Sequence, residues 1–160
     1  MFEAYYFPKD VLVAVLYGND ASPEKRSAGG AVEVQYGIEQ AINGRNLEEC
    51  IARCYYIKPN YPGRSSHICN AGFLVSPSKR EKGIGAAFAR SFLYYAPRLG
   101  YEASVLNLVY VNNVASVRLW GALNFTKVGR IPRAGWLKKA DGSGEEFVDA
   151  WVFYRRFDPI

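Results

Sequence analysis

The chain has 160 residues, of which 49% are hydrophobic and 15% aromatic, and it carries a net charge of +5. This length and apolar content predict one folded domain with a sizeable core rather than a disordered segment. The basic residues are dispersed and do not predict a nucleic-acid surface, and no apolar run approaches the roughly 20 residues of a membrane span.

The cysteines and the single histidine, His67, show no metal-ligand spacing, so the sequence predicts no metal site. We expect Cys50, Cys54 and Cys69 to be reduced and buried, as in a cytoplasmic protein. The first residues, Met1 to Ala4, contain no basic region and therefore predict no secretion signal.

The first half of the chain alternates between apolar runs and polar, glycine-containing stretches. Strands are predicted where β-branched and aromatic residues gather, and turns where proline and glycine gather. The predicted elements are a helix end at Phe2–Phe7, a buried strand at Val11–Tyr17, a loop at Gly18–Gly30, a short strand at Ala31–Gln35, a strand in the second half of Leu47–Ile57, and a turn at Lys58–Arg64.

Ser66–Val75 predicts the next strand, in which Gly72 indicates a bulge or a close backbone approach. A basic loop follows and opens into a helix whose apolar residues recur at i, i+3 or i+4 from Ile84 to Tyr95. A glycine-rich turn at a helix N-terminus is an anion site, because the first N–H groups have no partner within the helix. The loop lacks the Gly-Lys-Ser/Thr ending of a Walker loop, and Phe88 occupies the third glycine position of a dinucleotide-binding loop.

The second half predicts two more strand-and-helix steps and a final aromatic strand. Asn112 and Asn113 are suitable N-caps for the second helix. The predicted elements are a helix end at Pro97–Gly100, a strand at Ala103–Val111, a helix from Val114 to about Leu123, a strand at Phe125–Ile131, a loop at Pro132–Glu145 with a turn at Asp141-Gly142, and a strand at Phe147–Phe157.

Two segments resemble the GNAT superfamily of N-acetyltransferases. Arg80–Gly85 reads Arg-x-x-Gly-x-Gly shortly after Val-x-Pro, like the acetyl-CoA pyrophosphate loop of that family. Asn113–Phe125 resembles its later segment N-x-A-S-x-x-L-Y-x-x-x-G-F, although a core-packing helix with a good N-cap is the alternative. The resemblance implies an α/β GNAT fold in which a mixed central sheet, splayed between its fourth and fifth strands, is flanked by helices.

The resemblance also implies that residues 1–160 form a single acetyltransferase domain. The usual first strand and first helix of the fold are not evident in the sequence. Either the sheet starts short, or Ala31–Gln35 and Tyr36–Asn46 replace the missing elements.

The cofactor that the resemblance implies is acetyl-CoA. Its pantetheine arm would enter the splay and pair with the backbone of Phe73 and Val75, and the Phe73 N–H would face the developing oxyanion. Asn113 would contact the cofactor arm, and Arg118 a phosphate. The pyrophosphate would rest on the N–H groups of Arg80, Glu81, Lys82, Gly83, Ile84, Gly85 and Ala86.

The residues for acid–base catalysis depart from the family pattern. Trp120 replaces the tyrosine that often acts as the acid, and Cys69 occupies the position that often holds a glutamate base. His67 is a candidate base, because imidazole is the side chain most often used for proton transfer near neutral pH, with a structural role as the alternative. A water chain is equally compatible with the sequence, and Cys69 is either an acyl-carrying nucleophile or a small buried strand residue.

Two asparagines, Asn70 and Asn107, lie inside predicted strands among apolar residues. An amide there needs hydrogen bonds, so the two either bond to each other or to the backbone, or they line the acceptor cleft. The stretches HICNAGFLVSP and LNLVYVNNVAS resemble fungal acetyltransferases that act on azetidine-2-carboxylate and other proline analogues. This resemblance implies that Asn70 binds the acceptor carboxylate and that Asn107 lies near the thioester.

The function implied is direct acetyl transfer from acetyl-CoA to the amine of a small amino or imino acid. The alternatives are a protein or peptide N-acetyltransferase and a non-catalytic acyl-CoA sensor, while a nucleic-acid module is disfavoured. The aromatic-rich final strand, if it has an exposed edge, would suit a homodimer.

Overall fold

The computed structural model describes residues 10–15, 44, 46, 51–75 and 84–158. The predictions for Phe2–Phe7, Gly18–Gly30 and Ala31–Gln35, and most of those for the basic loop before Ile84, lie outside these residues. The described chain separates into two compact units. The first unit holds the residues up to Lys58 together with Ala71–Phe92, and the second holds Pro59–Asn70 together with the residues from Leu93 onward.

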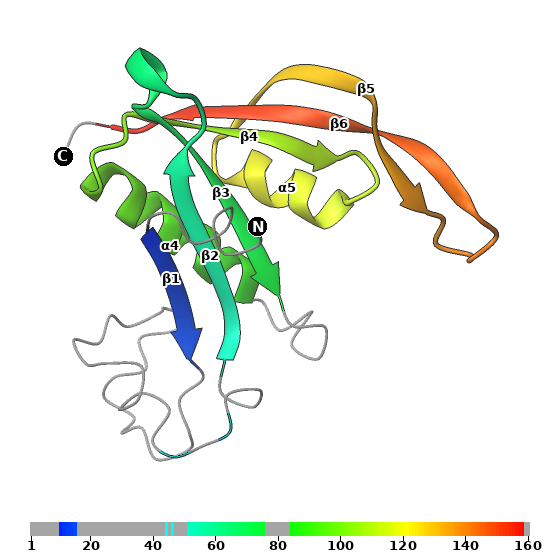
Figure 1. The fold of residues 1–160 in the computed structure, drawn as a ribbon, viewed down its shortest axis with the longest axis horizontal. Helices are drawn as coiled ribbons and strands as arrows, with labels where there is room; N and C mark the ends of the chain where they lie inside the picture. Colours follow the sequence, from blue (N-terminus) through cyan, green and yellow to red (C-terminus); the bar gives the residue numbers. More distant parts are fainter. Residues whose placement is uncertain (1–9, 16–43, 45, 47–50, 76–83, 159–160) are drawn as a thin grey trace. The chain divides into compact units, whose positions relative to one another are not determined.

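The described elements alternate between strands and helices and form a mixed sheet, as the sequence predicts (Figure 1). Strand order is β1-β2-β3-β4-β6-β5, with β3 parallel to β4 and the pairs β1/β2, β4/β6 and β5/β6 antiparallel. The elements are β1 (Asp10–Val15), β2 (Ile51–Pro59), a 3-10 turn η2 (Gly63–Ser65), β3 (Ile68–Val75), α4 (Ile84–Arg98), β4 (Ala103–Tyr110), α5 (Val114–Ala122), β5 (Thr126–Lys138) and β6 (Glu145–Arg156).

An aromatic cluster forms the core of the first unit. The ring of Tyr55, on β2, is stacked on Phe73 of β3 at 5.2 Å and meets Phe88 of α4 edge-on at 5.6 Å. Phe92 is fully buried against both Tyr55 and Phe73, and the Tyr55 hydroxyl is hydrogen-bonded to Ser91 at 2.8 Å. Aromatic side chains bury large areas, so this cluster fixes the first turns of α4 against β2 and β3.

The two helices end in the same way, with a residue of positive φ. Gly100, at φ +88°, closes α4 by donating to Pro97 O, while Tyr101 donates to Ala96 O. Asn124, at φ +59°, closes α5 with the matching pair of bonds, Asn124 N to Gly121 O and Phe125 N to Trp120 O. These are Schellman motifs, in which glycine or asparagine supplies the left-handed residue. The predicted helix end at Pro97–Gly100 is confirmed, with Pro97 still inside the last turn.

A long β5–β6 hairpin dominates the second unit and runs past the end of β4 (Figure 1). The prediction that Pro132–Glu145 is a loop is wrong for its first half, because β5 continues to Lys138. The register shifts between Ile131 and Gly135 and so accommodates Pro132. Asp149 on β6 stabilises this irregular stretch by accepting from the Arg133 N–H at 2.8 Å and from Arg130 at 2.9 Å.

The final strand is paired on both sides over most of its length, which narrows the premise of the homodimer prediction. β6 pairs with β4 over residues 150–156 and with β5 over residues 145–154, so β4 does not cover its edge at residues 145–148. β5 is the edge strand of this unit. Trp136 and Phe147, in the distal part of the hairpin, are exposed, and their ring centroids are 4.3 Å apart.

The close approach predicted at Gly72 is present and gives a test of the first unit. A Cβ at Gly72 would lie 2.3 Å from Cε1 of Tyr56, whose side chain is only 9% exposed. We expect Gly72→Ala to lower the free energy of unfolding by about 1–3 kcal/mol, because the ring must shift inside a packed core. Urea unfolding measures this change.

Gly121→Ala is the matched control, because nothing lies within 4 Å of a Cβ there and the residue is inside α5. This change should raise the free energy of unfolding by about 0.5–1 kcal/mol, since alanine favours the helix. Equal stability of the Gly72→Ala variant and the wild type would contradict the close packing at Tyr56.

Candidate functional site

β3 and β4 are parallel, with Ile68 paired to Ala103 and Cys69 paired to Ser104. β3 itself continues to Val75, and its residues from Ala71 onward belong to the first unit, whereas β4 belongs to the second. A splay between two strands would leave N–H and C=O groups that an extended ligand can bind. The splay expected here stays a prediction.

Asn70 and Asn107 lie on this part of β3 and β4. Alternation along β3 places Asn70 on the sheet face that carries Ile68, whereas Asn107 lies where the register of β4 shifts. Both are half-buried. Among the described residues the Asn70 side chain has no hydrogen-bond partner, so the two amides do not satisfy each other.

The partner of Asn107 is Asn60, a residue that the sequence did not single out. Asn60 Nδ2 donates to Asn107 Oδ1 at 3.1 Å, and Asn107 Nδ2 donates to Asn60 Oδ1 at 2.6 Å. Asn60 follows Pro59 in the predicted turn Lys58–Arg64, where asparagine is common for local reasons. The sequence pointed to Asn60 only indirectly, because an amide inside a strand, such as that of Asn107, needs a hydrogen-bond partner.

The first turn of α4 is the part of the predicted anion site that the structure describes. The helix begins at Ile84, so the N–H groups of Ile84, Gly85 and Ala86 have no acceptor four residues earlier inside the helix. No acidic residue lies in this turn, and the helix dipole adds partial positive charge. The loop residues predicted with them, Arg80, Glu81, Lys82 and Gly83, lie outside the described residues.

Phe73 and Val75 lie in the last four residues of β3. The Phe73 ring is fixed by Tyr55 at 5.2 Å and by Phe92 at 5.9 Å. This packing fixes the Phe73 side chain, and the cofactor contact predicted for its backbone stays a prediction.

Asn113 caps α5 as predicted. Its side-chain oxygen accepts a hydrogen bond from the Ser116 N–H at 3.2 Å. Arg118, one turn along the helix, is exposed. A side chain engaged as a cap still has its amide N–H groups available to a ligand. The cofactor contacts predicted for both residues stay predictions.

Trp120, which stands at the position of the family's acid, has a clear structural role. It is 6% exposed, and its ring meets Phe125 at 5.1 Å. This contact is the hydrophobic pair that accompanies the Schellman motif at the end of α5. An indole N–H is also a very poor acid, so the fold explains this residue without a catalytic role.

Cys69, the candidate nucleophile, and His67, the candidate base, differ in exposure. Cys69 is fully buried, and burial raises the pKa of its thiol to about 12, against a smaller opposing effect of Ser104. This favours the small buried strand residue over the nucleophile. His67 is exposed in the turn before β3 rather than in the strand, and its Nδ1 lies 3.1 Å from Arg64 O.

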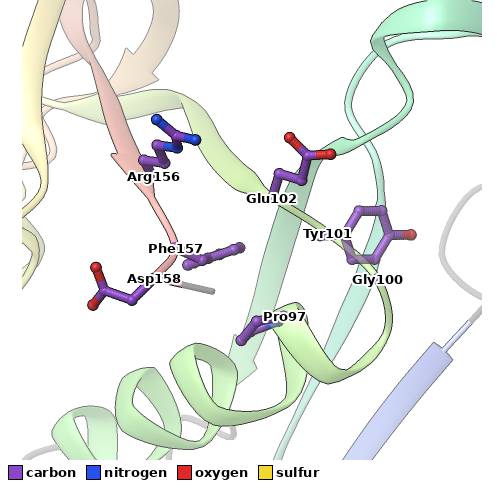
Figure 2. A pocket seen from close by; sticks show the side chains of 7 residues that line it. All are labelled: Pro97, Gly100, Tyr101, Glu102, Arg156, Phe157 and Asp158. Atoms are coloured by element: carbon purple, nitrogen blue, oxygen red, sulfur yellow. The ribbon is translucent and has the colours of Figure 1, made fainter. Parts of the chain in front are cut away.

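A separate pocket of about 350 Å³ lies in the second unit (Figure 2). The pocket is lined by Pro97, Gly100, Tyr101, Glu102, Arg156, Phe157 and Asp158. None of the predicted site residues lines it.

Among the described residues no group of three or more His, Cys, Asp or Glu side chains could hold a metal ion. In the same part of the chain, no helix is long and apolar enough to cross a membrane.

Comparison with known proteins gives three findings. Residues 34–125 match the acetyltransferase (GNAT) family. The N-acetyltransferase aca1 of Schizosaccharomyces pombe is 56% identical over 106 residues, which are 66% of this chain and 49% of that protein, so the chain spans about half of that relative's length.

Solved structures are similar as well. A GCN5-related N-acetyltransferase from Kribbella flavida is 28% identical with a TM-score of 0.61, covering 68% of this chain and 62% of its own. A phosphinothricin acetyltransferase of the GNAT superfamily from Sinorhizobium meliloti, in complex with acetyl-CoA, is 18% identical with a TM-score of 0.58. The match covers 70% of this chain and 57% of that one. The second likeness concerns the fold alone.

The buried thiol of Cys69 gives a test of its role. With a pKa of about 12, roughly one thiol in ten thousand is ionised at pH 8, so we expect iodoacetamide to leave Cys69 unlabelled in the folded chain and to label it in urea. Mass spectrometry of the digested protein measures the labelling. Because burial favours the neutral thiol, this group should reduce the free energy of unfolding as the pH rises from about 9 towards about 12.

Rapid labelling of Cys69 in the folded chain at pH 8 would contradict the buried role. It would indicate an accessible thiolate and would favour the acyl-carrying nucleophile instead.

Proposed function

The chain belongs to the acetyltransferase (GNAT) family and has the GNAT fold, and on this premise we propose that it transfers the acetyl group of acetyl-CoA directly to an amine. The observation that carries the proposal is the family match over residues 34–125, which includes the Arg-x-x-Gly-x-Gly segment Arg80–Gly85, inside which α4 begins at Ile84. The N-acetyltransferase activity in the name of the Schizosaccharomyces pombe relative supports it.

The proposed cofactor is acetyl-CoA, which the Sinorhizobium meliloti relative binds. Its pyrophosphate would lie on the free N–H groups at the start of α4 and against the basic side chains of Arg80 and Lys82. Its pantetheine arm would pair with the backbone of Phe73 and Val75 as an added strand does. Asn113 and Arg118 would add contacts from α5.

The chemistry proposed needs no covalent enzyme intermediate. The neutral amine attacks the thioester carbon, the new C–N bond forms, the C–S bond breaks and CoA leaves as the thiolate. The Phe73 N–H would donate to the carbonyl oxygen as negative charge develops on it. Orientation would supply much of the rate, because the thioester is already activated. The amine proton would pass to water or to His67, since Trp120 and Cys69 are both unsuited to proton transfer.

The proposed acceptor is a small amino or imino acid. Asn70 supports this choice, because a half-buried amide without a partner among the described residues can donate to a carboxylate. Peptide N-termini are the alternative acceptors. An acyl-CoA sensor is a second candidate function, favoured by the burial of Trp120 and Cys69, which leaves no evident acid within the described site.

Binding of acetyl-CoA tests the first step. At 100 times its Kd, acetyl-CoA should stabilise the chain by about 2.7 kcal/mol, which raises the melting temperature, and ATP at the same concentration should give a smaller shift. Arg80→Ala and Lys82→Ala should each weaken binding about tenfold or more, because each removes a charged phosphate contact. Calorimetric titration measures the affinities.

Lys138→Ala is the matched control, because Lys138 is an exposed cation on the distal hairpin. It should leave the affinity unchanged. Equal losses in all three variants, or no stabilisation by acetyl-CoA, would contradict the proposed cofactor site. Release of CoA with azetidine-2-carboxylate or with a peptide distinguishes the acceptors, and binding without release with either would favour the sensor.

A further inference from the structure

A reciprocal pair of amide hydrogen bonds joins Asn60, in the connection after β2, to Asn107 on β4. The two residues are 47 positions apart, and both hydrogen bonds join side chains only. Each amide donates one N–H and accepts one N–H, so neither amide can rotate without breaking both bonds. The pair therefore selects one orientation for the Asn107 side chain.

Asn60 is itself fixed to the backbone beside it. Its N–H donates to Ile68 O at 2.8 Å, and the connection that follows is closed by the Ser66 N–H donating to Gly63 O at 3.1 Å. Gly63 adopts φ +61°, which permits this tight turn. The connection that carries Asn60 is therefore fixed by backbone hydrogen bonds, so the Asn60 side chain can fix the orientation of the Asn107 amide.

Asn107 lies where β4 lacks a regular ladder. The register between β4 and β6 shifts between Leu106 and Val109, so Asn107 is in the irregular stretch. Such irregularities re-aim side chains and are frequent beside active sites. The two hydrogen bonds to Asn60 fix the direction of the Asn107 amide in this irregular stretch.

The bonds to Asn60 use only part of the hydrogen-bonding capacity of the Asn107 amide. A primary amide carries two N–H groups and two lone pairs, of which the Asn60 bonds use one each. Asn107 therefore keeps one N–H and one lone pair for a ligand. An N–H held in a fixed direction stabilises a developing oxyanion better than one that must first be oriented.

We propose that Asn60 is a positioning residue for acetyl transfer, which holds the Asn107 amide so that its remaining N–H is directed at the acyl oxygen of the bound thioester. This inference rests on the proposed function. It assigns to Asn60 no contact with the substrate, and it makes the two asparagines a single functional unit. The alternative is that the pair only anchors the β2–β3 connection, in which case its loss lowers stability and leaves catalysis intact.

Asn60→Ala tests this directly. Since the Asn107 amide would then be free to rotate, kcat for CoA release should fall about 10- to 100-fold, while the Kd for CoA changes less than threefold. The acceptors are azetidine-2-carboxylate and a peptide with a free N-terminus, and the kinetics are measured at least 15 °C below the melting temperature of each variant. In the double variant with Asn107→Ala, the loss should not exceed that of Asn107→Ala alone.

Asn60→Asp provides a readout that a structural role would not move. A carboxylate accepts from Asn107 Nδ2 but cannot donate to Asn107 Oδ1, whereas a protonated carboxyl group can do both. The kcat of this variant relative to wild type should therefore rise as the pH falls from 7 towards about 4, where aspartic acid is protonated. Taking the ratio to wild type removes the common effect of acceptor protonation.

Tyr61→Phe is the matched control in the same connection, because Tyr61 is exposed and adjacent to Asn60. Its kcat should equal that of wild type. A fall in melting temperature with unchanged kcat in Asn60→Ala, or a pH-independent ratio in Asn60→Asp, would overturn the inference while leaving the proposed function in place. A wild-type chain that releases no CoA with either acceptor would overturn the proposed function, and this inference with it.

Discussion

The parallel junction of β3 with β4 is the constraint on which the proposed site depends. Ile68 pairs with Ala103 and Cys69 pairs with Ser104. An extended ligand needs backbone groups that a strand ladder does not use. Cys69 and Ser104 are fully buried at this junction.

The surrounding packing holds several of the proposed site residues in place. The aromatic cluster around Tyr55 fixes the Phe73 side chain and the start of α4 in the same unit. The Schellman motif of α5 uses Trp120 and Phe125, and the cap at its other end uses Asn113. Of the titratable candidates, Cys69 is buried and His67 is exposed.

The sequence predicted most of the architecture, since its signals were local. The apolar runs gave β1 and β3, the helical period gave α4, and Asn113 correctly marked the start of α5. The extent of β5 was missed because Pro132 and a glycine turn suggest a loop, whereas Asp149 on the paired strand stabilises the irregular backbone there. The partner of Asn107 was missed for a similar reason, because the bond to Asn60 joins residues 47 positions apart and leaves no local pattern. The roles of the loop Arg80–Gly83 remain predictions.

The central proposal is that the backbone of β3 binds the pantetheine arm of acetyl-CoA and that Asn60 orients the Asn107 amide for acetyl transfer. A crystal structure of this chain with acetyl-CoA measures this most directly. We expect the pantetheine arm to be hydrogen-bonded to the backbone of Phe73 and Val75, with the acyl oxygen within hydrogen-bonding distance of Asn107 Nδ2 and the Asn60 pair intact. An arm bound elsewhere, or an Asn107 amide turned away from the acyl group, would contradict the account.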